Sequence, residues 1–311
     1  MSNLNLIFCG SGEFGLPTFS ALLGSGHRIV QVISQPDRPA GRGRGLTPTP
    51  ISQAALDAKL PLLRTADINK ESLPPADLMV VIAFGQKISD AVVHHPRLGS
   101  INLHASRLPK YRGAAPINWA IINGEQTTGN SVIRLAQKMD AGAILAQSEV
   151  QIGQNETAGE LHDRLAHDGV ALVSRVLEQL TTGTATETQQ NESHATLSPK
   201  LSRSTTKLDF SRPAEELARK VRGLFPWPGC RVRICDAAGK DIARARLARA
   251  RAADSEGDRW HPGEIMSDGL IQSGVGGLEI LEIQPESRGV MPLKDYRRGH
   301  AWPPGARIES V

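Results

Sequence analysis

The residues best suited to chemistry lie in the stretch INLHASRLPKYRG, residues 101–113. This stretch begins like a buried strand, but Asn102 and His104 interrupt the apolar run. Because strand side chains alternate between two faces, these polar groups share one face while Ile101 and Leu103 share the other. Either polar residue alone would more often be a core group satisfied by backbone bonds. Together, an amide and a protonated imidazole can both donate hydrogen bonds to an oxyanion.

A carboxylate would complete this set, because a histidine that moves protons usually has a partner that orients it or balances its charge. The candidate is Asp140, which lies between two strand-like segments and is followed by Gly142. A loop there could bring the acid to the same end of a sheet as His104, although spacing alone favours it only weakly over other acids. Ser106 lacks the G-x-S-x-G elbow of a nucleophile. The set therefore indicates direct group transfer, such as attack of an amine on an acyl or formyl carbon.

The elements that must position these residues alternate between strand-like and helix-like patterns. Such alternation predicts a Rossmann-like, mainly parallel α/β sheet with helices on both faces, with ligands at the carboxyl ends of the strands. The strand candidates are residues 4–10, 28–34, 77–84, 101–104, 130–137 and 143–150, and the helix candidates are residues 17–26, 51–60, 114–124 and 157–180.

A polar stretch rich in Thr, Ser, Gln and Asn follows the last of these helices and predicts a linker. We expect a catalytic domain at 1–188, a linker at 189–206 and a carboxyl-terminal domain at 207–311. In that domain a helix at 214–224 precedes short strand candidates, which favour a small OB-like β-barrel suited to a nucleic-acid partner, or another small β fold. The strand candidates are residues 231–235, 241–250, 263–266, 270–274 and 278–284, and residues 302–310 are expected to form a packed turn and a loose tail.

The composition is that of an ordinary globular protein, with 40% hydrophobic and 22% charged residues. No run approaches the roughly 18 apolar residues of a spanning helix, and MSNLNLIFCG lacks the features of a signal peptide, so we expect a cytoplasmic protein with no membrane partner. Three cysteines without a CxxC motif, and histidines without zinc spacing, predict neither disulfides nor a bound metal.

Positive charge is concentrated in the last third of the chain. Residues 1–200 contain 17 Lys and Arg against 17 Asp and Glu, whereas residues 201–311 contain 19 against 15, which accounts for the net charge of +4. An anionic partner and a merely solvated basic surface explain this equally well. The loop 35–50 combines Arg38, Arg42 and Arg44 with three glycines, so it could bend around a phosphate backbone or be a surface loop without function.

The turn GSGEFG, residues 10–15, fits the dinucleotide pattern G-x-G-x-x-G after a strand. That pattern also expects an acid at the end of the second strand, but this strand ends in ISQP and Asp37 follows late. We therefore expect a tight strand-to-helix turn and no nicotinamide site.

The segments INLHASRLPKYRGAAP and MDAG, in this order, resemble the formyltransferase family that uses 10-formyltetrahydrofolate. The resemblance extends over almost the whole chain, including LNLIFCGSGEFG, the loop 35–50, PKLSRSTTKLDF and FPWPGC. It implies a catalytic set of Asn102, His104 and Asp140. Members that formylate methionyl initiator tRNA for translation initiation are the most similar. Sugar-nucleotide formyltransferases are the alternative, because they carry a comparable extra domain.

The resemblance also implies binding residues and a folate co-substrate, and we expect a monomeric chain. Arg107 stands where the family commonly has Leu, so it could point to solvent or reach the glutamate tail of the folate. Phe84 stands where Tyr is common, which keeps an apolar wall. The implied folate contacts are Phe84, Gly85, Ser106, Arg107, Leu108 and Pro109, and the implied tRNA contacts are Arg38, Arg42, Arg44, Lys200, Arg203 and Lys207.

Overall fold

The computed structural model describes residues 3–40, 45–255 and 260–311. The chain forms two compact units, and each draws on several segments. The first unit contains the residues up to 113 together with 128–150 and 162–197, and the second contains 114–127, 151–161 and 198–311.

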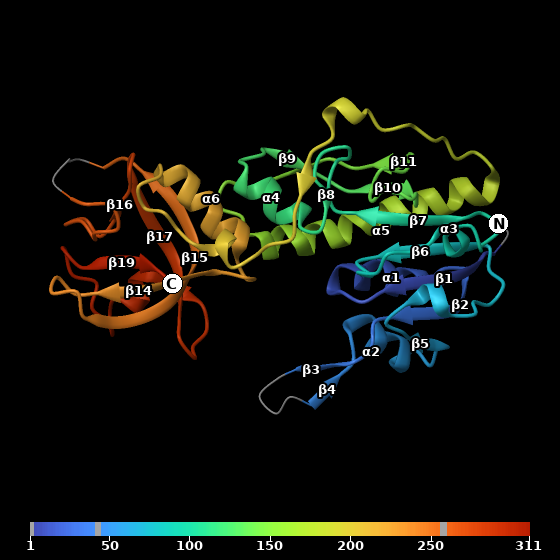
Figure 1. Cartoon of the computed structure of the whole chain (residues 1–311), viewed down its shortest axis with the longest axis horizontal. Coiled ribbons are helices and arrows are strands. Elements are labelled where there is room, and N and C mark those ends of the chain that lie inside the picture. The colour runs from blue at the N-terminus through green and yellow to red at the C-terminus, as the bar shows by residue number, and fades with distance from the viewer. Residues whose placement is uncertain (1–2, 41–44, 256–259) are drawn as a thin grey trace. The chain divides into compact units, whose positions relative to one another are not determined.

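The first unit is built on a seven-stranded sheet in the order β11-β10-β7-β6-β1-β2-β5 (Figure 1). The pairs from β7 to β5 are parallel, which confirms the predicted Rossmann-like sheet, while β10 runs antiparallel to both β7 and β11. The strands are β1 Asn5–Gly10, β2 Arg28–Ser34, β5 Leu62–Arg64, β6 Leu78–Ile82, β7 Ser100–His104, β10 Ser131–Arg134 and β11 Ile144–Gln147.

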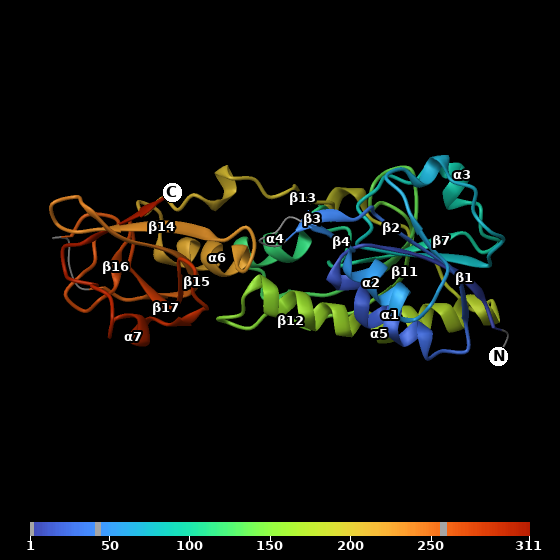
Figure 2. The ribbon, with the colours of Figure 1, turned by 90° about the horizontal axis from the view of Figure 1, so that it is seen from below.

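Helices cover the two faces of this sheet unequally. Figure 2 shows α1 (Leu16–Leu23), α2 (Pro50–Asp57) and the long α5 (Ala158–Thr182) on one face, and α3 (Asp90–Val93) on the other. Strand β1 packs against the apolar cores on both faces of the sheet. The Phe8 ring lies 4.9 Å from the Phe19 ring of α1, whereas Ile7 belongs to the core cluster on the other face. Since α3 has only four residues, loops cover much of the sheet face on which it lies.

The turn after β1 binds its own chain. The backbone N–H groups of Ser11 and Gly12 both donate to the carbonyl oxygen of Ala83, at 3.2 Å each. Ala83 follows β6 with a φ of 47°, which directs its carbonyl group into this turn. A phosphate bound at this turn would need these two backbone N–H groups, but both are hydrogen-bonded to the residue that follows β6.

The second unit contains an antiparallel, nearly closed barrel, as predicted, together with α4 (Pro116–Ile122) and α6 (Ala214–Leu224). Its strand order is β16-β17-β15-β14-β19, and β18 pairs with β17. The barrel elements are β14 Cys230–Cys235, β15 Asp241–Ala253, β16 Ile271–Gln272, β17 Gly277–Pro285, β18 Met291–Pro292, α7 Leu293–Tyr296 and β19 Arg307–Ser310.

Two expectations for this unit were wrong. Residues 263–266 form only isolated bridges, such as that between Ile265 and Ile271, and no regular strand. The expected loose tail instead contains β19, which pairs with β14 and buries Ile308 in the barrel core. A four-residue strand with a single core position gives too short a pattern for periodicity to detect.

The remaining elements are short. The ends of the arginine-rich loop pair as an antiparallel ribbon of β3 (Arg38–Ala40) and β4 (Gly45–Thr47). The others are η1 Glu13–Gly15, η2 Ile68–Lys70, β8 Arg112–Gly113, β9 Thr127–Thr128, β12 Val150–Gln151, η3 Glu192–His194, β13 Leu197–Ser198 and η4 Ser204–Thr206. Among the helices of the described residues, none combines the length and apolar character that a membrane crossing requires. The three cysteines are buried and unpaired.

Candidate active site

Strand β7 presents Asn102 and His104 on one face, as the alternation predicts. The Ser100 hydroxyl on the same face donates to the carbonyl of Val93 in α3 at 2.7 Å. Leu103 faces α5 so closely that a Cβ added to Gly169 would lie 2.5 Å from its Cδ2. The short α3 thus contacts the start of β7, and the two polar residues occupy the carboxyl end of the strand.

His104 is held by one ring nitrogen and faces an acid with the other. Its side chain is 7% exposed, and Nε2 lies 2.9 Å from the carbonyl oxygen of Tyr111. Because a carbonyl only accepts, Nε2 carries a proton. Nδ1 lies 3.8 Å from Oδ2 of Asp140, within ion-pair range but too far for a direct hydrogen bond. An oxyanion or a water molecule could therefore bond Nδ1.

Asn102 is half-buried between two neighbouring strands, paired with Val81 of β6 and Ile133 of β10. Within the described residues its side-chain amide has no hydrogen-bond partner. Both its donor and its acceptor are therefore available to a ligand.

Asp140 reaches His104 by an unexpected route. Strand β10 runs antiparallel to β7, so the loop 135–143 leaves the sheet beside Ile101, at the opposite end from His104. The loop then returns along the strand, since Oδ2 of Asp140 accepts a 2.9 Å hydrogen bond from the backbone of Gly113. Gly142 allows this path, because a Cβ there would lie 1.8 Å from the carbonyl oxygen of Arg134.

The turn after β7, which contains four of the predicted folate contacts, is held by hydrogen bonds within the turn and to Ser131 of β10. Ser106 is fully buried, and its hydroxyl donates to the carbonyl of Lys110 at 2.6 Å. Ser131 donates to the Ser106 carbonyl at 2.6 Å and accepts from the Leu108 backbone at 3.0 Å. Leu108 is buried and Pro109 is half-buried. Here the Ser106 hydroxyl stabilises the turn.

Arg107 forms an ion pair with Glu149, a partner that sequence reasoning missed. Both side chains are about half exposed, at 45% and 53%. In the structure the guanidinium group thus has an acidic neighbour on the protein surface.

Phe84 and Gly85 follow strand β6. Phe84 is buried in the core cluster that includes Ile7 and Met79, and its carbonyl accepts a 2.8 Å bond from Gln35. Gly85 has a φ of 74°, which a residue with a side chain rarely adopts.

One predicted tRNA contact lies near Gly85. Arg38 is exposed at the start of β3 and bonds Gln35, and it lines a cavity of about 280 Å³ together with Gly85 and Gln86. Arg42 and Arg44 lie outside the described residues.

The other predicted tRNA contacts, Lys200, Arg203 and Lys207, are exposed in the second unit. The Lys207 carbonyl accepts a 2.5 Å bond from Lys220. Among the described residues, no cluster of three or more His, Cys, Asp or Glu side chains could hold a metal ion.

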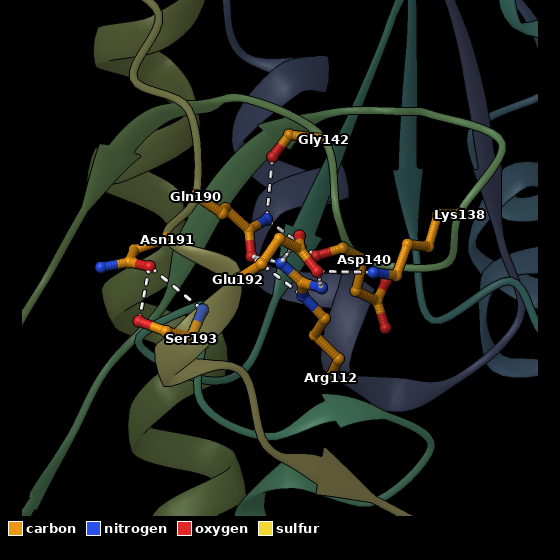
Figure 3. Close-up of polar contacts among 8 residues, drawn as sticks. All are labelled: Arg112, Lys138, Asp140, Gly142, Gln190, Asn191, Glu192 and Ser193. Carbon is orange, nitrogen blue, oxygen red and sulfur yellow. Dashed lines mark hydrogen bonds and ion pairs between the residues drawn. The ribbon is translucent and has the colours of Figure 1, made fainter.

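Sequence reasoning also missed a group of polar residues around the Asp140 loop (Figure 3). Arg112 is 4% exposed and bonds both Gln190 and Glu192. Hydrogen bonds from Arg112 and Lys138 lower the pKa of Glu192 from 4.5 to about 2. An arginine directly after the candidate segment 101–111 was the available signal, but no sequence pattern indicated partners about 80 residues away.

The sequence is similar to known formyltransferases over nearly its whole length. The formyl transferase model matches residues 3–177, and the formyl transferase C-terminal domain model matches residues 200–301. A methionyl-tRNA formyltransferase of Acidobacterium capsulatum is 39% identical, over 98% of this chain and 99% of the relative. The chain belongs to the methionyl-tRNA formyltransferase family. Another member, from Moorella thermoacetica, is 36% identical over 99% of this chain and 100% of its own.

Solved structures of more distant formyltransferases share the fold. An N-formyltransferase from Helicobacter canadensis, in complex with folinic acid and dTDP-3-aminofucose, superposes with a TM-score of 0.66 over 91% of this chain and 98% of its own. At 17% identity, this likeness supports the formyltransferase fold alone.

Proposed function

We propose that this enzyme transfers the formyl group of 10-formyltetrahydrofolate to the α-amino group of methionyl initiator tRNA, with Asn102, His104 and Asp140 as the catalytic residues. Two observations carry the proposal. The Nδ1 atom of His104 lies 3.8 Å from Oδ2 of Asp140, and on the same strand face as His104 lies the Asn102 amide, which has no partner among the described residues. The whole-length similarity to methionyl-tRNA formyltransferases supports the choice of acceptor.

The donor fits this site because a formyl oxygen needs hydrogen-bond donors, and the Asn102 amide has no partner among the described residues. In this reaction the α-amino nitrogen of the aminoacyl group attacks the formyl carbon. That amino group titrates near 7.7–8.0, so part of it is neutral and nucleophilic at pH 7. A new C–N bond forms, and the carbonyl oxygen becomes an oxyanion in a tetrahedral intermediate.

Asn102 and protonated His104 stabilise this oxyanion by hydrogen bonds. Because Nε2 of His104 is engaged by Tyr111, Nδ1 is the nitrogen that donates. Asp140 balances the imidazolium charge and takes up the amine proton, directly or through a water molecule. Collapse of the intermediate breaks the bond between the formyl carbon and N10, which receives a proton as the folate leaves.

The two substrates would use the surfaces expected from the sequence. The folate would lie against the segments around Phe84–Gly85 and Ser106–Pro109. The tRNA would contact the arginine-rich loop, with Arg38, Arg42 and Arg44, and the basic residues Lys200, Arg203 and Lys207. Guanidinium groups pair with phosphates through two parallel hydrogen bonds, which suits the arginines of the loop.

Steady-state formyl transfer by single variants tests the catalytic residues. Loss of one oxyanion donor should lower kcat about 100–1000-fold for Asn102→Ala and for His104→Ala, with the native fold retained at the assay temperature. His94→Ala, at the exposed residue directly after α3, is the matched control. Near wild-type turnover by either site variant would contradict the assignment.

The acceptor is tested by competition. Charged initiator tRNA and a nucleotide amino sugar are offered together with 10-formyltetrahydrofolate, and both products are measured. Formyl transfer to the tRNA is expected. Formylated sugar as the only product would replace this function by that of a sugar-nucleotide formyltransferase.

A further inference from the structure

Arg112 lies beside the Asp140 loop and is nearly excluded from solvent. A charge this buried is destabilising unless other groups surround it with hydrogen bonds. Gln190 Oε1 accepts from Nε of Arg112 at 3.0 Å and from Nη2 at 2.8 Å, and the two carboxylate oxygens of Glu192 accept at 2.8 and 3.1 Å. Both partners come from the polar segment after α5.

Gln190 joins this guanidinium group to the Asp140 loop. Its Nε2 donates to the carbonyl oxygens of Asp140 and Gly142, at 2.8 Å each (Figure 3). The orientation of the amide is fixed, because a guanidinium group only donates and a carbonyl only accepts. Reversing the amide would break all four hydrogen bonds.

The loop needs such support at Asp140. This residue has a φ of 53°, a left-handed conformation that residues with a side chain seldom adopt. The two bonds from Gln190 hold the carbonyl of Asp140 itself and that of Gly142, two residues on. The carboxylate is bonded by the backbone of Gly113, which directly follows Arg112.

We infer that Gln190, oriented by Arg112, is a positioning residue that holds Asp140 in its left-handed conformation against His104. Lys138, in the same loop as Asp140, also forms an ion pair with Glu192, at 2.5 Å. The polar segment after α5 thereby serves the catalytic loop. This inference rests on the role proposed above for Asp140.

Gln190→Glu is the most selective test. The new carboxylate still accepts from Arg112, but it has no N–H to offer the two carbonyls and repels them. Displacement of a catalytic group by about 1 Å can cost about 100-fold in rate. We expect kcat to fall about 10–100-fold, while KM for the folate and for the tRNA changes less than twofold. Gln190→Met, of similar size without hydrogen bonds, should show the same pattern.

Gln189→Ala, at the exposed neighbouring position, is the control and should match the wild type. Wild-type kcat in Gln190→Glu and Gln190→Met would overturn the inference. A rise in KM with constant kcat would also overturn it, because it would place Gln190 in substrate binding.

A double-mutant cycle with Asp140→Asn separates this inference from the proposed function. If Gln190 acts through Asp140, adding Gln190→Glu to Asp140→Asn should lower the residual kcat less than twofold. A full additional loss would show an action independent of Asp140 and overturn the inference. Wild-type turnover by Asp140→Asn itself would instead refute the proposed role of Asp140.

Discussion

Glu160 should make the stability of the second unit depend on pH. Its carboxylate accepts 2.9 Å bonds from the backbone and the hydroxyl of Thr157, the residue before α5. It also accepts from Nη1 and Nη2 of Arg249 in the barrel, at 3.0 and 2.7 Å. Hydrogen bonds from Arg249, followed by those from Thr157, lower the pKa of Glu160 from 4.5 to about 2.

The size and sign of the effect follow from linkage. A lowering from 4.5 to about 2 corresponds to about 3 kcal/mol, but the Glu160 side chain is 50% exposed, so screening reduces the contribution to about 1–2 kcal/mol. The group is ionised more readily in the folded than in the unfolded chain. Its contribution is therefore complete above pH 4.5, and it is lost as the pH falls toward 2.

Glu160→Gln removes this contribution, and tryptophan fluorescence can report it. The four tryptophans, at positions 119, 227, 260 and 302, all belong to the second unit. At pH 7 the variant should unfold at a urea concentration about 0.5–1 M below that of the wild type. At pH 3 the difference should fall to less than half, because the wild type has then lost much of the contribution.

Glu178→Gln, on the exposed surface of the same helix, is the matched control and should leave the midpoint unchanged at both pH values. A decrease of equal size at pH 7 and pH 3 in Glu160→Gln would refute the reasoning. The loss would then come from shape or capping and not from the ionised carboxylate.

Three other perturbations are expected to have measurable effects. Gly142→Ala forces a Cβ to within 1.8 Å of the Arg134 carbonyl oxygen, so it should lower the free energy of unfolding by about 1–3 kcal/mol and abolish most turnover. Gly289→Ala, with open space around it, should change neither stability nor turnover. Arg42→Ala should raise KM for the tRNA and flatten its salt dependence with folate binding unchanged, so an unaltered KM at several salt concentrations would contradict its proposed contact. All three cysteines are buried, and burial raises the pKa of the Cys9 thiol. A thiol reagent at pH 8 should therefore label the protein only after unfolding, and rapid labelling of the native protein would disprove this.

Much of the fold could be predicted because the strands of the first unit differ clearly from its helices in apolar periodicity. The same periodicity carries no information about strand direction, so the antiparallel course of β10 and β11 was not foreseen. It reliably assigned side chains to faces, which is why Asn102 and His104 could be placed together. Strand β19 pairs with β14, which lies about 75 residues earlier in the chain. The sequence near β19 contains no pattern that indicates this partner.

Asp140 shows why the rest of the site could not be predicted from local pattern. Aspartate does not favour a left-handed backbone strongly enough to fix this loop, and the loop leaves the sheet at the end opposite His104. Its conformation is instead supported by Gly113, 27 residues earlier, and by Gln190, 50 residues later. Local preference and global structure disagree at this residue, as they often do at functional sites. A polar segment rich in Thr, Ser and Gln is typical of a linker by composition alone, yet Gln190 and Glu192 bond the buried Arg112. Such a segment takes on a structural role only when a charge elsewhere in the fold requires hydrogen-bond acceptors, and that requirement becomes visible once the strands are assembled.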